Sequence, residues 1–235
     1  MVSRSAVSLG LSCDGACVFC AQKGLDPAAA RARAPRADVE RRLEEARVHG
    51  DSVTFVGGEP ALHPDLDDLV RRARALGFSR VGIQTNGWEL AKPGRLAALA
   101  AAGLTDVHLS IHGAEARVHD WHAARPGAFD AALAAMTAAR AAGLDVVVAT
   151  VLTRSSFRVL TAIPRLLVGR GASAWCIEVP RWRGLAATHA DRIVPRLSLA
   201  LPFALHALDA AQAVGLPAFV RGAPTCLLGP FASRA

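Results

Sequence analysis

The sequence lacks any apolar run long enough to cross a membrane. A spanning helix needs about 20 consecutive apolar residues, and no such stretch occurs, although 52% of the 235 residues are hydrophobic. This apolar content excludes a disordered chain, and the length suits one large domain better than two. The N-terminal residues MVSRSAVSLGLSC raise the alternative of a lipoprotein signal, but their apolar run is too short for one. We therefore expect a cytoplasmic protein.

Lysine is almost absent, with two residues against 25 arginines. The formal charge of +7 could indicate an acidic partner. The arginines are spread along the whole chain, however, whereas binding to nucleic acid needs basic residues gathered on one face. For the two densest stretches, residues 31–42 and 181–196, the composition favours solvated surface. We expect neither a nucleic acid nor a membrane as the partner.

Cysteine is scarce, and three of the five cysteines lie in CDGACVFC, residues 13–20. A reducing cytoplasm disfavours disulfides, so a clustered, odd set indicates metal. Structural zinc needs four ligands, usually in two pairs, and no second Cys or His pair follows at the usual distance. Three thiolates from one loop could instead hold three irons of a [4Fe–4S] cube and leave the fourth iron open. Buried cysteines without a metal are disfavoured, because Asp14 and Gly15 do not fit a core pattern.

Helical patterns recur along the chain and end at glycines, most of which precede a β-prone run. Glycine commonly follows a helix because it enters the left-handed region without penalty. We expect helix ends at Gly50, Gly77, Gly103, Gly143, Gly171 and Gly215, and strands at residues 6–12, 52–57, 80–85, 106–111, 146–152 and 174–179.

This alternation predicts parallel strands joined by helical crossovers. Six units are fewer than the eight of a closed barrel. The expected fold is α/β, an open partial (β/α)6 TIM-like barrel with outer helices, and a doubly wound sheet is the alternative. Residues 1–180 would form the core, and residues 181–235 would add a C-terminal helix and a short extension on the same domain.

Polar motifs follow four of these strands at their C-terminal ends, where such folds carry their sites. CDGACVFC follows the first strand, GGEP (residues 57–60) the second, QTNG (84–87) ends the third and LSIHG (109–113) the fourth. Four polar motifs on one rim of the sheet indicate a functional site there.

With these motifs in place, the sequence resembles the radical S-adenosylmethionine (SAM) enzymes. The resemblance rests on the Cys-x3-Cys-x2-Cys loop and on GGEP one β-α unit later, and it extends from the loop through the sixth strand. It implies that Cys13, Cys17 and Cys20 bind one [4Fe–4S] cluster, whose open iron takes the methionyl amine and carboxylate of SAM. Phe19 occupies the aromatic position before the third cysteine. Asp14 stands where the family often has asparagine.

The resemblance also implies residues that contact SAM. Gly57, Gly58 and Glu59 would receive the methionyl ammonium, since glycines permit close backbone approach and a carboxylate pairs with an ammonium. The remaining implied contacts lie at the ends of the third and fourth strands: Thr85, Asn86, Ser110 and His112. For His112, a backbone-bonded loop histidine is an equal alternative. Strand alternation independently places Ser110 and the histidines at 108 and 112 on the face opposite Val107, Leu109 and Ile111.

Other candidate residues have weaker support. His119 and His122 suggest a metal site, but a solvent-facing helix start is favoured. Cys176 would share a strand face with Glu178, which points away from the helix layer because a buried carboxylate is costly there. Cys226 could be a lid residue or an auxiliary-cluster ligand, but a buried core position is favoured.

The implied reaction is the reductive cleavage of SAM to methionine and a 5′-deoxyadenosyl radical, which abstracts hydrogen from a peptide or small-molecule substrate. A low-potential electron donor of the flavodoxin or ferredoxin type would be the redox partner. The alternatives are a regulatory or scaffold protein that binds a cluster without radical chemistry, and a glycyl-radical-type activase. The activase is disfavoured because LSIHG stands where such activases tend to carry Asp-x-Lys.

Overall fold

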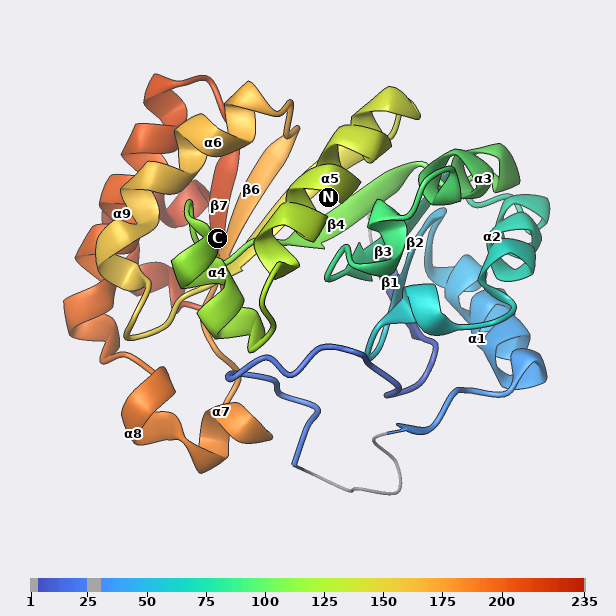
Figure 1. Cartoon of the computed structure of the whole chain (residues 1–235), viewed down its shortest axis with the longest axis horizontal. Helices are drawn as coiled ribbons and strands as arrows, with labels where there is room; N and C mark the ends of the chain where they lie inside the picture. The colour runs from blue at the N-terminus through green and yellow to red at the C-terminus, as the bar shows by residue number, and fades with distance from the viewer. Residues whose placement is uncertain (1–3, 25–30, 235) are drawn as a thin grey trace. The chain divides into compact units, whose positions relative to one another are not determined.

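The computed structural model describes residues 4–24 and 31–234, and its strands form one seven-stranded sheet in chain order, β1 to β7. Every pair with an assigned register is parallel. The strands are β1 (Arg4–Ser8), β2 (Ser52–Val56), β3 (Arg80–Thr85), β4 (Asp106–Ser110), β5 (Asp145–Val151), β6 (Ala174–Glu178) and β7 (Ala218–Arg221) (Figure 1).

The helices alternate with the strands. The α-helices are α1 (Arg36–His49), α2 (Leu66–Ala75), α3 (Arg95–Ala102), α4 (Ala116–Ala123), α5 (Ala128–Ala141), α6 (Ile163–Gly169), α7 (Leu185–Thr188), α8 (Ala190–Ile193) and α9 (Leu197–Ala213). Short 3-10 helices are η2 (Pro60–Leu62), η3 (Glu89–Ala91), η4 (Phe157–Ala162), η5 (Thr225–Leu227) and η6 (Gly229–Arg234). In the part of the chain that the structure describes, no helix combines the length and apolar character of a membrane span.

This topology confirms the predicted α/β partial barrel. A doubly wound sheet reverses its strand order at a switch point, and the order found here does not reverse. The predicted strands all form, although β1 begins and ends earlier than expected. Sequence analysis missed the short strand β7, which comes soon after the last predicted helix end.

The predicted glycines do lie at the helix ends. Gly103 is the C-cap of α3 at φ +110°, and Gly77, Gly143, Gly171 and Gly215 also have positive φ, between +73° and +87°. Gly50 follows α1 with a φ of 165°, which is extended backbone that any residue adopts. Left-handed geometry therefore explains five of the six positions.

The chain divides into two compact units, each with its own part of the sheet. Unit 1 comprises Met1–Gly15, Asp26–Leu109 and Ala131–Val146, and unit 2 comprises Ala16–Leu25, Ser110–Asp130 and Val147–Ala235. In unit 1, α1 packs against β1 and β2, and α2 against β3 (Figure 1). Alternate strand residues such as Val53, Phe55 and Ile83 are fully buried and form its core.

In unit 2, α9 packs against β7, α6 and η4 (Figure 1). Trp175 and Ile177 of β6 are fully buried, and Trp175 donates a hydrogen bond from Nε1 to Thr150 Oγ1 at 2.9 Å. Because side chains alternate along a strand, Cys176 and Glu178 lie on the other face of β6.

A buried polar cluster occupies the opposite sheet face of unit 1. Asp106 is completely buried, forms an ion pair with Arg4, and accepts hydrogen bonds from His108 Nε2 (3.0 Å) and Thr105 Oγ1 (2.7 Å). Gly82 lies beside Asp106 in the register, and a Cβ there would overlap both charged groups. Burial would raise the pKa of Asp106, but its hydrogen bonds and the Arg4 charge lower it to about 2.

Candidate active site

The loop after β1 and the loop after β2 are joined backbone to backbone. The Gly58 N–H donates to the Gly10 carbonyl and the Glu59 N–H to the Ser12 carbonyl, both at 2.8 Å. Gly57 has φ +145°, and a Cβ on Gly57 would overlap the Gly10 carbonyl oxygen. A Cβ on Gly58 would likewise overlap the Ser12 carbonyl oxygen. The two glycines of GGEP therefore allow the loop that carries Cys13 to pack closely against the loop that carries Glu59. The sequence alone predicted instead that these glycines allow SAM to approach the backbone.

Glu59 is buried at the centre of a hydrogen-bond network, with 3% of its surface exposed. Its Oε1 accepts hydrogen bonds from Thr85 Oγ1 at 2.7 Å and from the Ala61 N–H at 3.1 Å. Its Oε2 accepts one from the Asn86 N–H at 2.7 Å. An ionised carboxylate has about four acceptor positions, so Oε2 keeps capacity for one further donor.

Asn86 connects this network to the cysteine loop. Its Nδ2 donates to Asp14 Oδ1 at 2.9 Å, and its Oδ1 accepts from the Trp88 N–H at 2.8 Å. Asp14 directly follows Cys13, so the side chains of the first and third polar motifs are bonded to each other. Sequence analysis placed Thr85 and Asn86 at this rim but missed the bond to Asp14, because 72 residues separate the two partners and no local pattern links them.

Burial raises the pKa of Glu59 to about 7. The hydrogen bonds from Asn86, Thr85 and Ala61 work in the opposite direction, and the nearby charge of Asp14 adds to the rise. The carboxyl group therefore changes its charge close to neutral pH, and a cationic partner at Oε2 would stabilise the ionised form.

The remaining part of the cysteine loop, with Cys17 and Cys20, belongs to unit 2. The Ala16 and Val18 N–H groups donate to the carbonyls of Ala123 and His122, at 3.3 and 3.0 Å, so the loop satisfies carbonyls at the C-terminal end of α4. The Cys20 N–H donates to the Cys17 carbonyl at 3.1 Å. This second half of the loop is thus held by backbone contacts within its own unit.

Phe19 lies against a group of buried histidines. Its ring makes an edge contact with His112 at a centroid distance of 4.6 Å, and His112 stacks on His119 at 5.5 Å. His122 Nδ1 donates to the Val118 carbonyl at 2.7 Å, and its Nε2 accepts from Thr153 Oγ1, also at 2.7 Å. Burial lowers the pKa of all three histidines, to about 4 for His119.

These contacts correct the expectation that His119 and His122 face solvent. Both are buried in α4, whereas Trp121, which lies between them in the sequence, is exposed. His112 Nδ1 accepts a hydrogen bond from the Val151 N–H at 3.4 Å, as the backbone-bonded alternative requires. Ser110, the last residue of β4, is partly exposed at its strand end.

The two distant cysteines differ from each other. Cys176 is buried, and burial raises the pKa of its thiol to about 12, with Glu178 contributing to the rise. Cys226 is exposed in η5, so the expectation of a core position was wrong. Cys13, Cys17 and Cys20 are partly exposed.

Thiolate sulfur suits an iron–sulfur cluster, and a loop with three partly exposed cysteines fits such a group. Within residues 4–24 and 31–234, no three His, Cys, Asp or Glu side chains converge as a single metal ion requires. In a cluster each cysteine binds a different iron, so convergence on one point is not needed there.

Known structures share this fold. The structure of Streptococcus suis SuiB bound to the precursor peptide SuiA superposes with a TM-score of 0.79, over 97% of this chain and 50% of that chain, at 18% identity. SuiB has also been solved bound to S-adenosylmethionine, with a TM-score of 0.75. At this identity the likeness establishes the fold alone.

Sequence comparison identifies the family. The model of the Radical SAM superfamily matches residues 7–155, so the chain belongs to the radical SAM superfamily. The family implies S-adenosylmethionine and an iron–sulfur cluster as cofactors.

Curated relatives of the chain differ in their printed activities. A probable GTP 3′,8-cyclase of Halobacterium salinarum is 34% identical over 224 residues, which cover 83% of this chain and 59% of the relative. An AdoMet-dependent heme synthase of Oleidesulfovibrio alaskensis is 30% identical over 142 residues, which cover 60% of this chain and 36% of the relative. The chain therefore spans less than two thirds of the length of these relatives.

Proposed function

We propose that this chain is a radical SAM enzyme that reductively cleaves S-adenosylmethionine at a [4Fe–4S] cluster and abstracts hydrogen from a peptide or small-molecule substrate. The observation that supports it most is the backbone junction between the Cys13 loop and Glu59. It brings the first cysteine and a buried carboxylate with a remaining acceptor position together within unit 1. The cluster would supply the electron that breaks the S–C5′ bond of SAM.

In this proposal Cys13, Cys17 and Cys20 hold the cluster, and the protein residues around them bind and orient SAM. Glu59 Oε2 accepts the methionyl amino group, because it has capacity for one more donor beside the Asn86 N–H. Thr85 and Asn86 keep the carboxylate in place through their own hydrogen bonds.

Gly57 and Gly58 hold the two loops together. The remaining proposed contacts rest on the family resemblance. Ser110 contacts SAM from the end of β4, and Phe19 and His112 line the site with an aromatic surface. His112 is neutral there, because burial lowers its pKa.

Anaerobic reconstitution with iron and sulfide, followed by SAM and dithionite, tests the proposal. An enzyme yields 5′-deoxyadenosine, whereas a regulatory or scaffold protein binds iron and yields none. Cys226→Ala is the matched control for Cys13→Ala, because Cys226 is exposed in the C-terminal segment. Zinc binding without iron would contradict both functions.

The substrate class is open to the same assay. Relatives include PqqA peptide cyclase of Ruegeria pomeroyi, at 28% identity over 78% of this chain, as well as the GTP cyclase and the heme synthase. We propose a peptide or a small metabolite as the substrate. Substrate-dependent stimulation of 5′-deoxyadenosine formation would identify it.

A further inference from the structure

Residues 181–196, between β6 and α9, form a basic surface in unit 2. Four arginines and one aspartate lie in this stretch, and Arg181, Arg183, Arg192 and Arg196 are exposed. None of the four forms an ion pair with a residue that the structure describes. Trp182, between the first two, is 72% exposed. The stretch therefore presents four exposed arginines and a single aspartate, Asp191, so its charge is predominantly positive.

The same segment contacts the third cysteine of the loop. The Leu185 N–H donates to the Cys20 carbonyl at 2.9 Å. Gly184 is buried against the loop, since a Cβ there would lie 2.6 Å from the carbonyl oxygens of both Cys20 and Lys23. Arg183 therefore precedes a backbone junction with Cys20, and the basic surface adjoins the cysteine loop.

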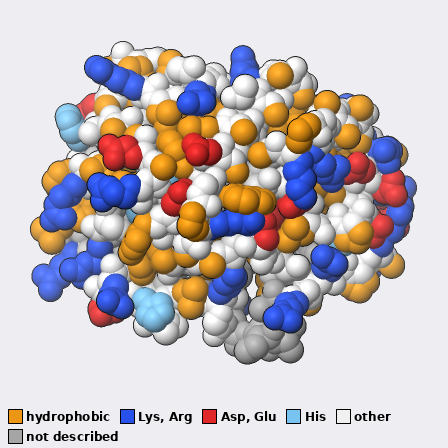
Figure 2. Space-filling view, in the orientation of Figure 1, with side chains coloured by type: hydrophobic (Ala, Val, Ile, Leu, Met, Phe, Trp, Pro, Cys, Tyr) orange, Lys and Arg blue, Asp and Glu red, His pale blue; other side chains and the backbone are white. Residues whose placement is uncertain are grey.

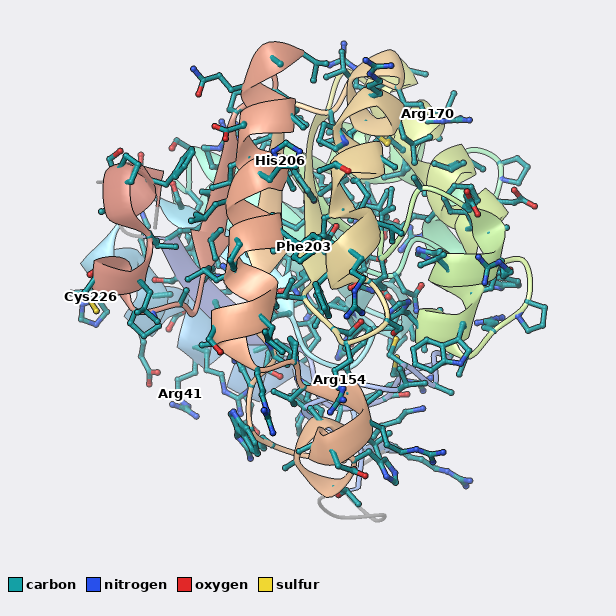
Figure 3. The ribbon with its side chains drawn as sticks, turned by 90° about the vertical axis from the view of Figure 1, so that its left-hand side faces the viewer. Arg41, Arg154, Arg170, Phe203, His206 and Cys226 are labelled. Carbon is teal, nitrogen blue, oxygen red and sulfur yellow. The ribbon has the colours of Figure 1, made fainter. Side chains whose placement is uncertain are left out.

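Arg154 extends the surface from the loop after β5. Its Nη1 donates to the Asp191 carbonyl at 2.6 Å, and its backbone N–H donates to the Ile193 carbonyl at 2.9 Å. Figure 3 shows Arg154 directly beside the short helix α8. In Figure 2, basic side chains gather at the lower left, where Figure 1 places α7 and α8. We name the set Arg154, Arg181, Trp182, Arg183, Arg192 and Arg196 the arginine surface.

We propose that the arginine surface docks an acidic protein that donates single electrons to the cluster. This inference rests on the proposed function, which needs one electron per SAM cleaved. The donor loses one electron and the cluster gains it, so no further co-reactant is needed. Uncompensated positive charge attracts an acidic partner and speeds its encounter, and the junction with Cys20 places that partner beside a cluster ligand.

The double variant Arg181→Glu with Arg183→Glu tests the docking. A reduced flavodoxin serves as the acidic donor and dithionite as the small chemical reductant. The matched control is Arg140→Glu with Arg170→Glu, which makes the same charge change at two exposed helix ends. Figure 3 shows Arg170 at the opposite end of unit 2 from Arg154.

We expect flavodoxin-driven formation of 5′-deoxyadenosine to fall at least about tenfold at low salt in the test variant, with dithionite-driven formation unchanged. The control variant should behave like the wild type in both assays. Flavodoxin affinity of the wild type should also weaken as salt rises. Equal flavodoxin-driven rates in test and control variants would overturn the proposal.

Two further measurements keep the outcomes separate. The iron content shows whether the test variant retains its cluster. If the cluster is lost, the double variant Arg192→Glu with Arg196→Glu is tested in its place. If the wild type cleaves no SAM with dithionite, the proposed function fails. In that case the docking proposal is still tested by binding alone. It predicts that the wild type binds flavodoxin in a salt-dependent manner and that the test variant loses this binding.

Discussion

Replacing Glu59 by glutamine changes one atom of the buried network and removes its charge. The glutamine oxygen can keep the hydrogen bonds from Thr85 and Ala61, which both reach Oε1. Its NH2 group cannot accept the Asn86 N–H, which now donates to Oε2. A buried donor left without an acceptor costs about 1–3 kcal/mol.

Removal of the charge offsets this loss. A pKa rise from 4.5 to about 7 makes the ionised carboxylate cost about 3 kcal/mol, because each pKa unit is worth about 1.4 kcal/mol. Since the pKa is raised in the folded chain, the stabilisation from the bound proton is complete below about pH 4.5 and is lost as the pH rises through about 7. At pH 8 we therefore expect Glu59→Gln to change the free energy of unfolding by less than about 2 kcal/mol.

SAM affinity should change far more than stability does. If Glu59 pairs with the methionyl amino group, the loss of one charge-assisted hydrogen bond costs about 1.5–3 kcal/mol, or about ten- to a hundredfold in Kd at pH 8. At pH 6 only about a tenth of the wild-type carboxyl is ionised, so the ratio of the two Kd values should fall to about two- to tenfold.

The ratio isolates Glu59, because the titration of SAM itself affects both proteins equally. Anaerobic SAM titration at both pH values, with iron content measured in parallel, provides the data. Glu45→Gln, an exposed substitution in α1, is the control. Equal affinities at pH 8, or a ratio independent of pH, would remove Glu59 from the SAM site.

Three other substitutions test separate parts of the structure. Replacing any one cysteine of the loop at residues 13–20 by alanine should abolish SAM cleavage and lower the iron and sulfide content. The control Cys226→Ala should retain both the cleavage and the iron and sulfide content. Full cleavage by a loop variant would refute the proposed set of cluster ligands. Cys176→Ala should leave uncoupled SAM cleavage intact but impair product formation, because a thiol with a pKa of about 12 stays protonated and can donate hydrogen; unchanged product yield would make it a spectator. Asp106→Asn should lower the free energy of unfolding by about 2–3 kcal/mol in a urea titration, because it removes the buried charge that pairs with the partly exposed Arg4 and whose pKa is lowered from 3.8 to about 2. The exposed Asp145→Asn should cost less than about 1 kcal/mol, and equal losses for the two would show that burial of Asp106 adds nothing.

Much of the fold followed from local patterns. Glycines near the ends of six helices and the apolar runs between them are set by residues close in sequence, so those helix ends agree with the structure and all six predicted strands form, with β1 shifted toward the N-terminus. The strand β7 was missed because four residues carry too little periodicity to distinguish a strand from a loop. The burial of His119 and His122 was also missed, since it depends on contacts outside their own helix. His119 lies against His112 and Phe129, and His122 contacts Phe19 and Thr153.

The sequence by itself determined the spacing of the three cysteines, the GGEP motif and the parallel α/β architecture, because each depends on neighbouring residues or on a short repeat. Tertiary structure alone decided what surrounds them. It bonded Asp14 to Asn86, placed Glu59 where burial raises its pKa, and set Gly184 against the Cys20 carbonyl. These effects arise from atoms brought together across long stretches of chain, and a pKa or a close contact depends on that final distance rather than on sequence order.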